Sequence, residues 1–126
     1  SKSKNAIYSN TTALYLHGFS NRIPIRYDIT INSGYNGSLQ KEKNVNLFYT
    51  KRELIELGVI NYKLDSGNII KVYDLDKTIC DIIKNKKKID AEIFTKAIRE
   101  YFYSKNKNTL KLYYNKVRDT FEVFGW

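Results

Sequence analysis

The hydrophobic pattern of this chain changes its period at Asp74, and that change limits the folds the chain can adopt. Before Asp74, apolar and polar residues alternate in short runs, which is the period of β-strands. After Asp74, apolar residues recur every three or four positions, which is the period of amphipathic helices. A run of strands followed by a run of helices predicts an α+β fold. We expect a small, mostly antiparallel sheet of three to four strands, packed against a short N-terminal helix and three C-terminal helices.

The clearest predicted strand is residues 26–32, where Tyr27, Ile29 and Ile31 alternate with polar residues. This alternation predicts a strand with one buried face and one solvated face. The other predicted strands are 45–49 and the two arms of a hairpin, 60–64 and 69–73, joined by a turn at 65–68.

Capping residues set the expected helix boundaries. Ser9 or Asn10 begins a short apolar helix that runs to about His17 and stops at Gly18. Residues 1–7 before it are expected to be a frayed lead-in. The later expected helical segments are one or two turns at 51–57, a helix from Asp74 to about 83, a linker at 84–88, a helix from Asp90 to about 103, and a last helix after Asn108 or Thr109.

The 126 residues allow one domain, 1–126, and the composition excludes several kinds of site. A single Cys excludes an internal disulfide and any zinc site built from several cysteines, and a single His excludes sites that need two. A lone free Cys is typical of a reducing compartment, so we expect a cytoplasmic protein. Nothing in the sequence calls for a cofactor or a metal.

The net charge of +9 is concentrated in one segment, residues 84–118, which holds eleven basic and only three acidic residues. Such a concentration favours anionic partners such as nucleic acid or an acidic protein face. An equally weighted alternative is a solvated lysine-rich surface. The candidate binding residues are Lys84, Lys86, Lys87, Lys88, Lys96, Arg99, Lys105, Lys107, Lys111, Lys116 and Arg118.

Catalysis finds little support in the sequence. His17 lies at a helix end, where interaction with carbonyl groups is its expected role, and Cys80 lies on an apolar helix face. A nuclease-like or degenerate nuclease domain would draw its carboxylates from Asp28 and the segment 74–77. Residues 34–38 carry two glycines without a phosphate-loop pattern and are expected to be a turn.

A free-standing RNA-binding module is a further alternative, because basic residues and eleven tyrosines can supply phosphate contacts and stacking. About half of the tyrosines, however, are expected on core faces. These are Tyr27, Tyr62, Tyr101, Tyr113 and Tyr114.

Two segments resemble a known family. Residues 12–20, TALYLHGFS, resemble the TALYLHGLS element of the AbiEi family of antitoxins, and residues 70–83, IKVYDLDKTICDII, resemble its VYDLERTLCDLI element. Between them, residues 29–31, 34–35 and 56–59 match in order and spacing. The resemblance covers roughly residues 9–115, and the last ten residues match the family less well.

The resemblance implies an antitoxin of a bacterial type IV toxin–antitoxin system, linked to abortive infection and phage defence. Family members counter a nucleotidyltransferase-like toxin through a C-terminal domain. They also repress their own operon through an N-terminal winged-helix domain that binds operator DNA. This chain matches the C-terminal domain and does not begin with Met, so we expect a fragment without the winged helix.

The sequence thus predicts a non-enzymatic antitoxin domain with a basic working surface. The matched elements are mostly helix starts and apolar stripes, which are expected to determine the fold. Asp81 is the exception, because it is an acid on an otherwise apolar helix. It is expected to be solvated or capping, or else to pair with Arg22 or Arg26.

Overall fold

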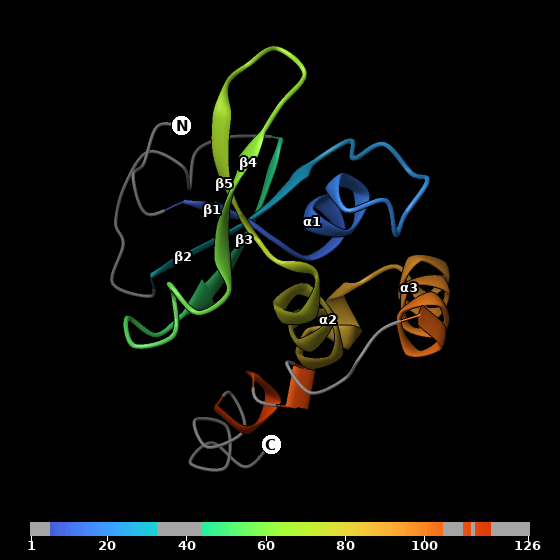
Figure 1. Cartoon of the computed structure of the whole chain (residues 1–126). Helices are drawn as coiled ribbons and strands as arrows, with labels where there is room; N and C mark the ends of the chain where they lie inside the picture. The colour runs from blue at the N-terminus through green and yellow to red at the C-terminus, as the bar shows by residue number, and fades with distance from the viewer. Residues whose placement is uncertain (1–5, 33–43, 105–109, 112, 117–126) are drawn as a thin grey trace.

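A computed structural model describes residues 6–32, 44–104, 110–111 and 113–116 (Figure 1). The described residues begin with a short strand and a helix, continue with four consecutive strands and end in helical segments. The elements are β1 (Ile7–Tyr8), α1 (Asn10–Leu16), β2 (Tyr27–Asn32), β3 (Val45–Thr50), β4 (Val59–Lys63), β5 (Ile69–Tyr73), α2 (Leu75–Lys84), the 3-10 helix η2 (Lys86–Lys88) and α3 (Ala91–Ser104). The expected α+β class is confirmed.

The sheet has five strands in the order β3-β2-β1-β5-β4. It is mixed, because β1 pairs parallel with β5 and β2 pairs parallel with β3, while the other two pairings are antiparallel. The prediction of a mostly antiparallel sheet with three to four strands was therefore wrong in strand number and direction. The predicted hairpin is confirmed, with Ile60 opposite Val72 and Tyr62 opposite Ile70.

The strand missing from the prediction is β1, which lies at the centre of the sheet. Ile7 was expected to belong to a frayed lead-in, but its side chain is buried. It pairs with Thr30 of β2, while Tyr8 pairs with Val72 of β5. Two residues give no period to detect, and so this central strand leaves no sequence signal.

Strand β2 is buried on both faces, whereas the alternation predicted only one buried face. Asp28 is buried because its carboxylate accepts hydrogen bonds from the backbone and hydroxyl of Thr11 and from the Asn46 amide. Thr30 is buried with its hydroxyl donating to Ser9 at 2.8 Å. These polar residues thus connect β2 to the start of α1.

Capping side chains begin the helices α2 and α3 as predicted. Asp74 accepts a hydrogen bond from the Lys77 backbone at 2.8 Å, and Asp90 accepts from the backbones of Glu92 and Ile93. These bonds satisfy amide groups that a helix leaves without partners in its first turn. The pKa of Asp90 is lowered, mainly by the bond from the Ile93 amide; desolvation opposes this shift, and Arg22 and the Glu92 amide add to it.

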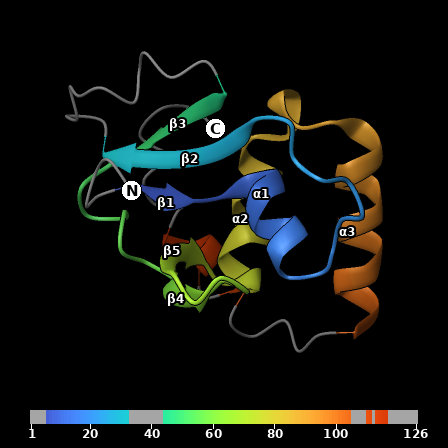
Figure 2. The same ribbon diagram turned by 90° about the horizontal axis from the view of Figure 1, so that it is seen from above.

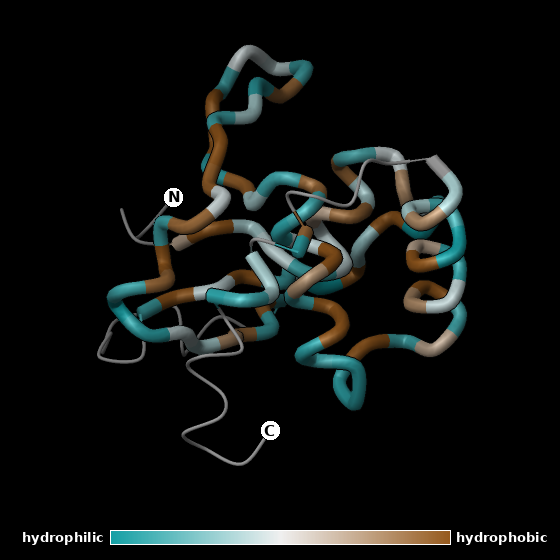
Figure 3. Tube along the Cα trace, turned by 60° about the horizontal axis from the view of Figure 1, so that its bottom comes forward, coloured by the Kyte–Doolittle hydropathy of each residue, from teal (hydrophilic) through white to brown (hydrophobic). Residues whose placement is uncertain are grey.

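The helices gather on one side of the sheet, where β1 leads into α1 and β5 leads into α2 (Figures 1 and 2). One core cluster holds α1, α2 and α3 together with β3. Along α3, hydrophilic residues face outward and apolar residues face α2 (Figure 3). The buried members of the cluster are Leu14, Phe48, Ile79, Cys80, Ile82, Ile89, Ala97, Tyr101 and Leu110.

The segment 51–57 forms consecutive turns, not the expected helical segment. The Leu54 amide bonds to the Lys51 carbonyl, and the Leu57 amide bonds to that of Leu54, so each bond spans three residues. Residues 110–111 and 113–116 are helical, as expected for the last helix. Tyr113 anchors this segment by donating its hydroxyl hydrogen to Asp74 at 2.7 Å. The predicted turn at 34–38 lies outside the described residues.

Candidate functional site

Residues 12–20 and 70–83 lie against each other. His17, at the end of α1, approaches the carbonyl oxygen of Tyr73 with its Nε2 atom at 2.8 Å. Because a carbonyl only accepts, Nε2 donates the hydrogen. The His17 ring also packs edge-on against Tyr62. The expected structural role of His17 is therefore confirmed, and the carbonyl it bonds to belongs to β5.

Asp81 forms a buried ion pair with Lys77 one helical turn earlier. Lys77 Nζ lies 2.6 Å from Asp81 Oδ1, and both side chains are almost inaccessible to solvent. The expectation of a solvated or capping carboxylate was wrong, and so was the pairing with Arg22 or Arg26. Arg22 instead pairs with Asp90 and Glu92, and Arg26 bonds to β3. The Lys77–Asp81 spacing of four residues was visible in the sequence, but burial of both was not.

Close contacts enclose the Lys77 side chain. Its ammonium lies 4.2 Å from the centroid of the buried Tyr73 ring, a cation–π contact in a desolvated place. The Lys77 stem packs against Gly58, where an added Cβ would come within 2.6 Å of Lys77 Cβ. Gly58 also has a φ of +81°, which other residues rarely adopt. The glycine therefore makes room for the buried lysine.

Cys80 lies in the same part of α2 and is buried. Burial, followed by the nearby Asp81 carboxylate, raises the pKa of its thiol to about 12. A thiol with so high a pKa is scarcely ionised at neutral pH, and the thiolate is the nucleophile. Cys80 therefore packs as a small hydrophobic residue, as expected.

The carboxylates named for a nuclease all have structural partners. Asp28 accepts hydrogen bonds from Thr11, Asp74 caps α2, and Asp76 accepts the Tyr101 hydroxyl hydrogen. The described residues contain no group of three or more His, Cys, Asp or Glu side chains placed to hold a metal ion. The chemistry of these acids is therefore that of caps and hydrogen-bond acceptors.

The candidate lysines 86–88 form the short helix η2, which we call the basic turn. All three are exposed. The ammonium of Lys86 lies 5.3 Å from the Phe94 ring centroid, and that of Lys88 lies 5.8 Å from the Phe48 ring centroid. Within the described residues none of the three pairs with a carboxylate. The basic turn thus presents three adjacent cationic groups to solvent.

Lys84 differs from these lysines because it lies in the last turn of α2 and is half-buried. Burial lowers the pKa of its ammonium, with Asp81 acting in the opposite direction. A cation at the C-terminal end of a helix interacts favourably with the helix dipole. The Lys84 ammonium therefore stabilises the C-terminal end of α2 and is less accessible to an external partner than the lysines of the basic turn.

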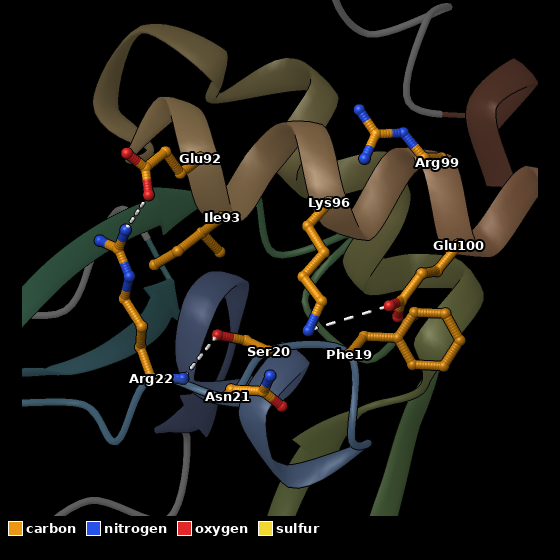
Figure 4. Close-up of a pocket in the computed structure, with 9 residues that line it drawn as sticks. All are labelled: Phe19, Ser20, Asn21, Arg22, Glu92, Ile93, Lys96, Arg99 and Glu100. Carbon is orange, nitrogen blue, oxygen red and sulfur yellow. Dashed lines mark hydrogen bonds and ion pairs between the residues drawn. The ribbon is translucent and has the colours of Figure 1, made fainter.

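Lys96 and Arg99 line a groove between α3 and the loop after α1 (Figure 4). The groove has a volume of about 450 Å³. Arg22 lies across it and pairs with Glu92 at 2.6 Å and with Asp90 at 3.0 Å. Lys96 lies 3.8 Å from Glu100, so each acidic residue of the groove lies beside a cation. The groove is consequently mixed in charge and only weakly cationic.

Only part of the predicted basic surface is one patch. The prediction rested on the number of charges along the chain, and in the structure the groove that Lys96 and Arg99 line does not include the basic turn. Lys111 and Lys116 are exposed on the last helical segment, and Lys105, Lys107 and Arg118 lie outside the described residues. Arg22, the groove residue that the sequence missed, is 68 residues from its partner Asp90, so no local pattern could reveal it.

Comparison with known proteins adds no identification. No protein-family model matches the chain, and none of the curated proteins matches it. Among the helices within the described ranges, none has the length and apolar character required to cross a bilayer.

Proposed function

We propose that this chain is the antitoxin domain of a bacterial type IV toxin–antitoxin system similar to the AbiEi family. In this proposal the domain counters a nucleotidyltransferase-like toxin in the cytoplasm without catalysing a reaction. The observation that carries the proposal is the contact between the two resembling segments. His17 of the first bonds to Tyr73 of the second across 56 positions of sequence.

The same two segments share one core. Leu14 of the first segment packs in the cluster that contains Ile79, Cys80 and Ile82 of the second. Asn85, just after the second segment, donates a hydrogen bond to Asn10 at 3.2 Å. A domain similar to the family would require the two segments to pack together. Their packing into a single unit supports the reading that the resemblance extends to the domain as a whole.

The basic turn is the proposed working surface. Its lysines are exposed, adjacent and without carboxylate partners among the described residues. Exposed cationic groups of this kind attract an anionic partner over several ångströms, and salt weakens the attraction. The groove of Lys96 and Arg99 is second in rank, because Glu92 and Glu100 offset much of its charge.

Growth rescue tests the proposal. The toxin encoded beside this chain is expressed in a bacterium, and the chain is supplied from a second plasmid. We expect growth to return when the chain is present. Absence of rescue, with the chain shown to be folded and expressed, would contradict the proposal.

A further inference from the structure

A groove unrelated to the basic turn lies between α1, the segment 23–27 and the hairpin of β4 and β5. It has a volume of about 340 Å³. A water molecule occupies about 30 Å³ of liquid, so the groove has room for several aliphatic groups. Tyr8 and Tyr27 form one wall and meet edge to face at 6.0 Å, while Leu16 and Ile70 contribute aliphatic surface.

The groove is apolar in a strongly basic protein. The described residues that line it carry no charge, although the chain has a net charge of +9. Four cations are adjacent in sequence to lining residues without lining the groove themselves: Arg22, Arg26, Lys63 and Lys71. Arg22 pairs with Asp90 and Glu92, and the Arg26 guanidinium bonds to Asn46 and to the Val45 carbonyl on β3. A nucleic acid or an acidic peptide would find no cationic partner in this lining. The occupant that fits is an uncharged apolar side chain.

The same surface also carries an unusual apolar projection. Ile25 is 92% exposed and directly follows Ile23 and Pro24, which both line the groove. Ile25 does not line the groove of its own chain. A projection and a cavity on one patch are what a twofold symmetric contact requires, because each copy must offer both halves.

We propose that this chain forms a twofold dimer in which Ile25 of each copy enters the groove of the other. Two molecules that each carry +9 repel one another, and the uncharged lining of this groove is a place where they can meet without burying like charges. A single loop and groove is small beside the roughly 800 Å² per partner of a standard interface. The dimer is therefore weak and depends on concentration. This proposal is independent of the antitoxin function.

Sedimentation equilibrium of the purified chain at physiological salt, from micromolar to millimolar concentration, tests the dimer. The wild-type chain is expected to shift from monomer mass towards dimer mass. Ile25→Asp should weaken the dimer at least about a hundredfold, since the substitution places a charge in an apolar groove twice per dimer.

Ile69→Asp is the matched control, because Ile69 is 66% exposed and does not line the groove. It should leave the dimer intact. Circular dichroism confirms that both variants fold, as expected for substitutions at exposed positions. A wild-type chain that stays monomeric at every concentration would overturn the proposal and leave the groove to a different protein. Equal behaviour of the two variants would overturn it as well.

Discussion

Lys77 Nζ and Asp81 Oδ1 lie 2.6 Å apart inside the protein, and neither side chain has appreciable contact with solvent. The pair is held in register by one turn of α2. Burying two charges is costly, and mutual attraction offsets that cost only while both partners are present. The pair therefore acts as a unit. Replacing one member and replacing both members are expected to change the free energy of unfolding differently.

Removal of one partner should be far worse than removal of both. Lys77→Met leaves a buried carboxylate alone and should lower the free energy of unfolding by about 3–5 kcal/mol. Adding Asp81→Leu removes that lone charge, so the double variant should be more stable than Lys77→Met. Urea denaturation of the wild type, the two single variants and the double variant measures the coupling. Additive losses would contradict this account.

The His17–Tyr73 bond should contribute to stability, since it joins α1 to the end of β5. His17→Ala should lower the free energy of unfolding by about 1 kcal/mol, because the Tyr73 carbonyl retains the Thr78 hydroxyl as a partner. Tyr15→Ala is unsuitable as a control because Tyr15 lines the apolar groove. Gly67→Ala should change only the local strain of the hairpin turn. If His17→Ala lowers the free energy of unfolding by no more than the measurement error, the role of the bond is refuted.

Cys80 should resist alkylation in the folded protein. Its thiol is buried and has a pKa of about 12, raised mainly by burial. At pH 8 we expect iodoacetamide to modify Cys80 only after addition of denaturant, as followed by mass spectrometry. Rapid modification of the native chain would show that α2 opens readily or that Cys80 is accessible.

The contribution of Asp90 to stability should be sensitive to acid. Its pKa is lowered from 3.8 in the folded chain, first by the Ile93 amide, so its contribution is complete above the unfolded value. As pH falls below 3.8 through the folded pKa, that contribution is lost. Asp90→Ala should therefore lower Tm at pH 7, and its difference from the wild type should narrow below pH 3.8. A difference that is constant with pH would mean that the charge of Asp90 contributes nothing.

The sequence predicts α2 and α3 well because each has both a period and a cap. Asp74 and Asp90 mark the starts of α2 and α3 where the structure has them. The sheet is predicted less well. Ile7 and Tyr8 are too few to show alternation, yet they form the central strand.

The site is less predictable than the fold, since a sequence records charge but not burial. From the sequence, we expected the Asp81 carboxylate to be solvated or capping, or to pair with an arginine. Its partner is instead Lys77 on the same helix. The eleven basic residues looked like one surface, but Lys84 is half-buried, and Lys96 and Arg99 line a groove together with Glu92 and Glu100. Contacts between distant segments, such as Arg22 with Asp90, decide which charges remain available.

The central claim is that the domain protects cells through the basic turn. Its most direct measurement is the growth rescue assay with two charge-reversed triple variants. In the first, Lys86, Lys87 and Lys88 are replaced by Glu. The matched control replaces Arg52, Lys63 and Lys71, which are also exposed, with the same change of net charge.

Because all six side chains are exposed, both variants should keep the Tm of the wild type within a few degrees. The account predicts rescue by the wild type and by the control, and loss of rescue by the variant of the basic turn. Full rescue by the folded basic-turn variant would contradict the account.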